Sequence, residues 1–77
     1  MKLTDAVRFR LRNIIEERGL TQYQIHKEGG IAKSTISQML SGKKERIEIH
    51  TLYEITATIG ISLKDFFDDP MFNDIED

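Results

Sequence analysis

A chain of 77 residues, 39% hydrophobic and 31% charged, has the size and composition of one small globular domain. It contains no cysteine, which excludes disulfide bonds and thiolate zinc sites, and no apolar run approaches the roughly 20 residues of a membrane span. Because the N-terminal stretch also lacks the apolar core of a signal peptide, we expect a cytoplasmic protein without membrane contacts.

The net charge of −2 hides an uneven distribution along the chain. Residues 1–50 hold ten lysines and arginines against six acids, a net charge of +4. Residues 51–77 hold one lysine against seven acids, a net charge of −6. An ordinary mixed surface is one interpretation, but the segregation favours a basic working face and an acidic back.

The first predicted helix runs from Thr4, whose hydroxyl suits an N-cap, to Arg18, and Gly19 ends it. One face of this helix is apolar and is expected in the core: Leu3, Val7, Leu11, Ile14 and Ile15. Phe9 lies on the opposite side and should be exposed. Three arginines spread over the flanks and are expected to be solvated: Arg8, Arg10 and Arg12.

The second predicted helix, about Gln22 to Glu28, begins with a capping box. Thr21 precedes it, and Gln24 stands three residues after Thr21, the spacing at which side chains and backbone cap each other. The pair Gly29-Gly30 ends the helix, where a residue that tolerates a positive φ fits best.

The third predicted helix, about Lys33 to Ser41, has one apolar and one polar face. At 100° per residue, its apolar positions share one stripe: Ala32, Ile36, Met39 and Leu40. The opposite side carries only hydroxyls and one amide: Ser34, Ser37, Gln38 and Ser41. Such a face, without a carboxylate, suits the edges of DNA bases, which present hydrogen-bond donors and acceptors beside phosphates. Ala32 supplies no side-chain N-cap, a loss of about 1 kcal/mol.

A basic loop, residues 42–48, follows the third helix. Lys43, Lys44 and Arg46 in this loop resemble phosphate contacts, and a merely solvated loop is the alternative. A fourth helix, about Ile49 to Ile59, is closed by Gly60. Its inward side is predicted from the spacing of four residues: Leu52, Ile55, Thr56 and Ile59.

A short fifth helix has Ser62 as its N-cap and Asp65 at the capping-box position. Three of its residues are expected to fill the core: Leu63, Phe66 and Phe67. The stretch Asp68-Asp69-Pro70 ends this helix. The acidic tail, residues 70–77, carries Met71, Phe72 and Ile75, and it is either frayed or docked against exposed apolar surface.

Two helices joined by a glycine turn over residues 21–42 follow the helix-turn-helix plan. With other blocks in the same order, the chain resembles the lambda-repressor-like, Cro/C1-type (XRE) helix-turn-helix family. The blocks that carry the resemblance are Glu17–Gln22, Gly30-Ile31, Ser34–Ser37, Ser41–Lys43, and Gly60–Leu63 with Phe66-Phe67. The resemblance spans residues 7–68. It implies an all-α fold, a compact five-helix DNA-binding domain over residues 1–69.

The function that the resemblance implies is sequence-specific binding of double-stranded operator DNA by a transcriptional regulator, expected to be a repressor and a homodimer at least on DNA. Residue by residue, it assigns base reading to four positions of the third helix: Lys33, Ser34, Ser37 and Gln38. It assigns DNA-backbone contacts to five positions: Gln22, Tyr23, Ser41, Lys43 and Lys44. It implies no metal and no cofactor.

Two departures from the family pattern carry expectations of their own. His26 stands where the family usually has a small residue, and it is either a pH sensor or ligand group or a partly buried structural histidine. With only His50 as a second histidine, it makes a poor metal site. Ile15 and Leu40 replace a charged pair common in the family, so we predict that they touch in the core.

Motifs of catalysis are missing from the sequence, which has no glycine-rich phosphate loop, nucleophile elbow or paired histidines on a helix. We therefore expect a protein that is not an enzyme. The competing hypothesis is a protein-interaction module, such as an antitoxin-like or adaptor domain on the same fold. The polar third helix and the basic loop favour DNA, since an apolar face there would favour a protein partner.

Overall fold

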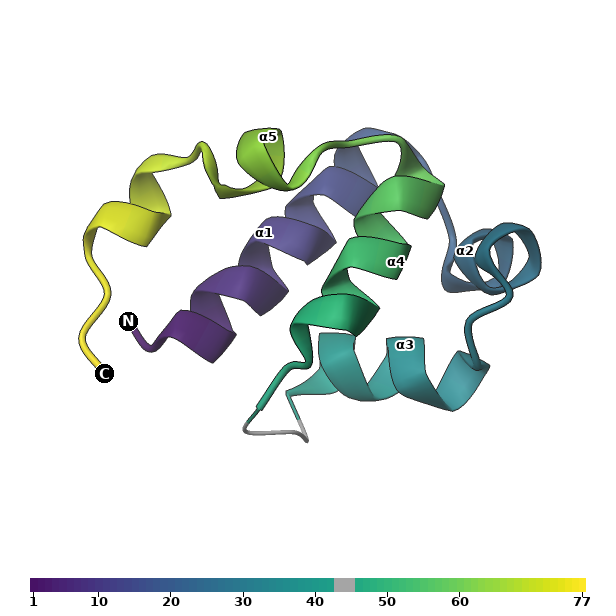
Figure 1. Cartoon of the computed structure of the whole chain (residues 1–77), viewed down its shortest axis with the longest axis horizontal. Helices are drawn as coiled ribbons and strands as arrows, with labels where there is room; N and C mark the ends of the chain where they lie inside the picture. Colours follow the sequence, from purple (N-terminus) through teal and green to yellow (C-terminus); the bar gives the residue numbers. More distant parts are fainter. Residues whose placement is uncertain (43–45) are drawn as a thin grey trace.

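The computed structural model describes residues 1–42 and 46–77, and helices are the regular structure of this part of the chain. Figure 1 shows their arrangement, with the two ends of the chain close together. The elements are α1 (Leu3–Glu17), α2 (Gln22–Gly29), α3 (Lys33–Ser41), α4 (Ile49–Ile59), α5 (Leu63–Phe67) and a 3₁₀ turn, η1 (Pro70–Asn73). The predicted all-α, five-helix fold is confirmed.

One apolar cluster joins all five helices, because each helix turns its hydrophobic stripe toward the same centre. The helix α2 packs against both α3 and α4, and α1 packs against α3. The largest fully buried side chains are Leu11, Ile25, Ile36, Leu52, Ile55, Thr56 and Phe66. Ile15 and Leu40 are both buried in this cluster, while the direct contact between them stays a prediction.

The first turn of α1 differs from the prediction. The helix begins at Leu3 with Lys2 as N-cap, so the expectation that Thr4 caps it is wrong. A carboxylate oxygen of Asp77 instead accepts the Leu3 N–H at 3.0 Å, where a negative charge complements the helix dipole. Leu3 is also 44% exposed rather than in the core, because it lies at the rim where α1 extends beyond the packed cluster.

Arg12 of α1 and Arg18, which directly follows α1, donate to backbone carbonyls at the C-terminal ends of other helices. Arg12 donates from Nε and Nη2 to the Leu40 carbonyl near the end of α3, with a distance of 2.8 Å for Nε. Arg18 donates from Nη1 to the Ile59 carbonyl at the end of α4 at 3.1 Å. The last carbonyls of a helix lack intrahelical partners and form the negative end of its dipole, so a guanidinium is favourable there.

Arg10 makes the same kind of contact with α5. Its Nε and Nη2 donate to the carbonyls of Phe66 and Asp65 at 2.7 and 2.9 Å. Its Nη1 also lies 3.5 Å from the carboxylate of Asp69. Arg10 therefore fixes α5 and the start of η1 against α1.

Arg8 pairs with Asp5 one turn earlier on α1, at 2.7 Å between Nη2 and the carboxylate. The prediction that Arg8, Arg10 and Arg12 are simply solvated is wrong, since each has a partner inside the fold. Sequence periodicity places these side chains on the flanks of α1 but does not show which later helix ends lie beside them. Much of the positive charge of residues 1–50 is thus used within the domain.

The acidic tail is docked rather than frayed. Phe72 of η1 lies against Phe66 and Phe67, with ring centroids 6.1 and 5.0 Å apart. Beyond η1, the Glu76 N–H donates to the Met1 carbonyl at 2.9 Å. The tail therefore covers the core beside α5 and closes against the beginning of α1.

Candidate nucleic-acid interface

The capping box predicted at Thr21 is present and fixes the first turn of α2. The Gln24 N–H donates to the Thr21 hydroxyl at 3.1 Å, and the Thr21 N–H donates to the Gln24 side-chain oxygen at 2.8 Å. Gln22 and Tyr23, the first two residues of α2, are both exposed, and 56% of the Tyr23 surface is open to solvent. Both candidate backbone contacts therefore stand on a rigid helix start, open to solvent.

The turn between α2 and α3 is built by Gly30 and His26. Gly30 has a φ of +65°, a conformation that favours glycine, and its N–H donates to the His26 carbonyl at 3.0 Å. The half-buried His26 ring lies 2.6 Å from the Ile31 carbonyl through Nδ1, which carries the proton because a carbonyl only accepts. The structural interpretation of His26 as a partly buried residue is confirmed.

A close approach to α4 fixes the other side of α2. A Cβ placed on Gly29 would lie 2.5 Å from the Thr58 hydroxyl oxygen, closer than real atoms approach. Thr58 is itself held by a 2.8 Å hydrogen bond from its hydroxyl to the Glu54 carbonyl. Glycine at position 29 therefore lets α2 sit deep against α4, which sets the tilt of the helix pair.

The helix α3 turns its apolar stripe inward and its polar face to solvent. Ile36, Met39 and Leu40 are buried. The four candidate base-reading residues are all exposed on this one helix: Lys33, Ser34, Ser37 and Gln38. Ala32 is the N-cap without a side-chain hydrogen bond, as predicted, so the first amides of α3 are not satisfied by a cap.

One contact between α2 and α3 was not predicted from the sequence. The Lys33 ammonium lies over the ring of Tyr23, 5.1 Å from its centroid. This is within the range of a cation–π interaction. Tyr23 and Lys33 were assigned separate tasks, and their ten-residue separation gives no periodic signal that links them.

The C-terminal end of α3 carries the remaining candidates. Ser41 is exposed, and its hydroxyl donates to the Gln38 carbonyl at 3.3 Å, which leaves the oxygen available as an acceptor. Lys43 and Lys44, the two lysines predicted to contact phosphates, lie outside the described residues.

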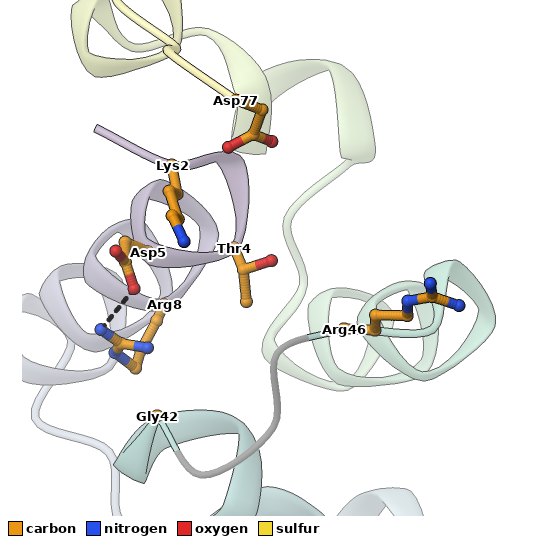
Figure 2. A pocket seen from close by; sticks show the side chains of 7 residues that line it. All are labelled: Lys2, Thr4, Asp5, Arg8, Gly42, Arg46 and Asp77. Atoms are coloured by element: carbon orange, nitrogen blue, oxygen red, sulfur yellow. Dashed lines mark hydrogen bonds and ion pairs between the residues drawn. The ribbon is translucent and has the colours of Figure 1, made fainter.

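A polar depression of about 530 Å³ adjoins this end of α3, between the beginning of α1 and residue 46. Figure 2 shows the Arg8–Asp5 ion pair on one side of the depression and the Arg46 side chain pointing away from this pair. The lining residues are Lys2, Thr4, Asp5, Arg8, Gly42, Arg46 and Asp77. Lys2, which belongs to no sequence motif, lines this depression together with Arg8 and Arg46.

Within residues 1–42 and 46–77, no three histidine or acidic side chains gather as they would around a metal ion. His50 lies 3.2 Å from the Glu54 carboxylate on the surface of α4.

None of the helices in the described part of the chain is long and apolar enough to cross a membrane.

Comparison with known proteins agrees with this geometry. A family model described as a Cro/C1-type helix-turn-helix DNA-binding domain matches residues 10–70. The crystal structure of the prophage Lp1 protein 11 is similar to this chain, with 33% sequence identity and a TM-score of 0.80. The match covers 97% of this chain and 100% of that chain. A comparison with curated protein sequences found no match.

Proposed function

The chain belongs to the Cro/C1-type helix-turn-helix family of DNA-binding domains, and we propose that it is a sequence-specific transcriptional repressor that reads the major groove with α3. The observation that carries this proposal is the exposed face of α3, which presents one ammonium, hydroxyls and an amide without any carboxylate. An α-helix fits the major groove, where each base pair presents a distinct pattern of donors and acceptors.

Two sets of residues have different tasks in this proposal. Base reading belongs to the exposed face of α3: Lys33, Ser34, Ser37 and Gln38. Contacts to the DNA backbone belong to residues around it: Gln22, Tyr23, Ser41, Lys43 and Lys44. Because the four arginines between residues 8 and 18 are engaged within the fold, the charge that attracts phosphates comes chiefly from lysines near α3 and from Arg46.

We further propose that the protein binds a two-fold symmetric operator as a homodimer. A nine-residue helix is about 13.5 Å long, so one α3 spans only about four base pairs. Half-sites of such operators lie about 34 Å apart, and the described domain measures 34 × 24 × 20 Å. Two copies with their long axes along the duplex therefore reach each other.

The exposed apolar residues of α4 support a contact between the two copies. Ile49 and Tyr53 lie one helical turn apart and are 64% and 54% exposed. Ile49 and Leu3 border an apolar depression of about 120 Å³, and Ile49 begins the helix that follows the basic loop after α3. An Ile49→Asp variant should bind a duplex with one half-site as the unmutated protein does, but lose cooperative binding to the full operator. Sedimentation with each duplex measures how many copies of the protein are bound.

Selection from a random pool of duplexes at moderate salt, followed by sequencing, tests the proposed function. A recurring two-fold symmetric motif supports it. If no duplex is enriched, even at low salt, the chain is a protein-interaction module of the antitoxin or adaptor kind. In either case the proposed activity is binding rather than catalysis, in the cytoplasm.

A further inference from the structure

We propose that Tyr23 is a positioning residue that holds Lys33 against its ring, so that the ammonium reads a guanine facing the beginning of α3. This inference rests on the proposed function and reassigns Tyr23, which the sequence placed among the backbone contacts. The ring rather than the hydroxyl is the part of Tyr23 that matters for sequence selectivity.

The geometry around Tyr23 makes its ring a fixed platform. Tyr23 is the second residue of α2, directly after the capping box at Thr21. Its ring lies 6.3 Å from the ring of His26, and His26 is bound through Nδ1 to the Ile31 carbonyl. The same helix start and the same turn therefore determine where Tyr23 lies and where α3 begins.

Lys33 needs such a platform because of its place in the helix. It is the first residue of α3, where the positive end of the helix dipole disfavours a cation. A free lysine side chain is also a flexible point charge, suited to phosphates and poorly suited to a base edge. The Tyr23 ring, 5.1 Å from the ammonium, opposes both effects by attracting and orienting the cation.

Guanine is the base that this arrangement fits. Its O6 and N7 are two acceptors in the major groove, and lysine or arginine donating to them is the commonest specific contact. Adenine presents a donor beside its N7 and would face the ammonium with an amino group. The cation–π contact thus converts Lys33 from a general phosphate-seeking residue into one that prefers guanine.

The experiment is a double-mutant cycle on duplexes selected by the unmutated protein. Duplexes selected by Lys33→Ala are compared with those selected by the unmutated protein, and the position at which the base preference is lost is the one that Lys33 reads. A matched duplex then carries adenine in place of guanine at that position. The ratio of affinities for the two duplexes is then measured for the unmutated protein, Tyr23→Leu, Tyr23→Phe, Lys33→Ala and the double variant Tyr23→Leu/Lys33→Ala. Phe9→Leu is the control, because the exposed Phe9 ring on α1 has its own arginine, Arg8, 5.6 Å from its centroid and no assigned DNA contact.

Tyr23→Leu should reduce the guanine preference about three- to fivefold, and it should have no further effect in the Lys33→Ala background. Tyr23→Phe keeps the ring, so it should keep the ratio even where affinity for both duplexes falls. Phe9→Leu should leave the ratio unchanged. Circular dichroism and the thermal midpoint establish that each variant is folded.

Three results would overturn the inference while leaving DNA binding in place. They are an unchanged ratio in Tyr23→Leu, additive effects of the two substitutions, and a base other than guanine at the position lost in Lys33→Ala. A Tyr23→Phe variant with the same loss of preference as Tyr23→Leu would instead assign the effect to the hydroxyl. Failure of the unmutated protein to select any duplex would refute the proposed function itself.

Discussion

Replacing Arg12 tests whether α1 holds the C-terminal end of α3 in place. The guanidinium donates twice to the Leu40 carbonyl. Hydrogen bonds that involve a charged group contribute about 1.5–3 kcal/mol, and a cation at a helix C-terminus adds about 0.3–1 kcal/mol at exposed sites. Because Arg12 is exposed overall, we discount these values and expect Arg12→Ala to lower the free energy of unfolding by about 1–2 kcal/mol.

For a domain of this size, a loss of about 1.5 kcal/mol lowers Tm by roughly 6–12 °C, which calorimetry or circular dichroism measures easily. Arg12→Lys should lose about half as much, because a single ammonium keeps the charge but not the paired N–H groups. Arg8→Ala is the control, since Arg8 pairs with Asp5 one turn away on the same helix and such a pair contributes only about 0.2–0.5 kcal/mol. An Arg12→Ala loss no larger than the Arg8→Ala loss would refute the reasoning.

Two further substitutions test the packing around α2 and α3. Gly29→Ala should destabilise the domain by about 1–3 kcal/mol in urea unfolding, because its Cβ would collide with Thr58. Adding Thr58→Ala should restore most of that loss, and no rescue would show that the collision is not the cause. Leu40→Ala should cost about 2–5 kcal/mol, because Leu40 is 5% exposed in the core; a cost below 1 kcal/mol would mean that this end of α3 is loosely packed.

The fold could be predicted from the sequence wherever a local rule determines the structure. Thr21 and Ser62 cap the helices that follow them, as their spacing to residues 24 and 65 indicates. Gly30, Gly42 and Gly60 end helices in the left-handed conformation that glycine favours. In each case the residues that decide the geometry lie within four positions of one another.

Contacts between distant segments could not be predicted in the same way. Arg10, Arg12 and Arg18 meet carbonyls 28 to 56 residues away. The start of α1 is capped by Asp77 rather than Thr4. Neither partner leaves a periodic trace in the sequence. Leu3 fits the apolar stripe of α1 but lies beyond the end of the packed cluster, because periodicity gives a direction and not a depth.

The candidate site shows the same division. The exposure of Lys33, Ser34, Ser37 and Gln38 follows from helical periodicity alone. The contact between Lys33 and Tyr23 depends on how α2 crosses α3, which the turn at Gly30 determines.

The most direct test of base reading by α3 compares Gln38→Ala on the selected duplex and on a scrambled duplex at several salt concentrations. A glutamine amide binds adenine through paired hydrogen bonds, so we expect a loss of about 1–3 kcal/mol on the selected duplex only, with the salt dependence unchanged. Lys44→Ala, the matched comparison, should weaken binding to both duplexes and make the slope of log affinity against log salt shallower by about one. Equal weakening of both duplexes by Gln38→Ala would contradict the claim that α3 reads the sequence.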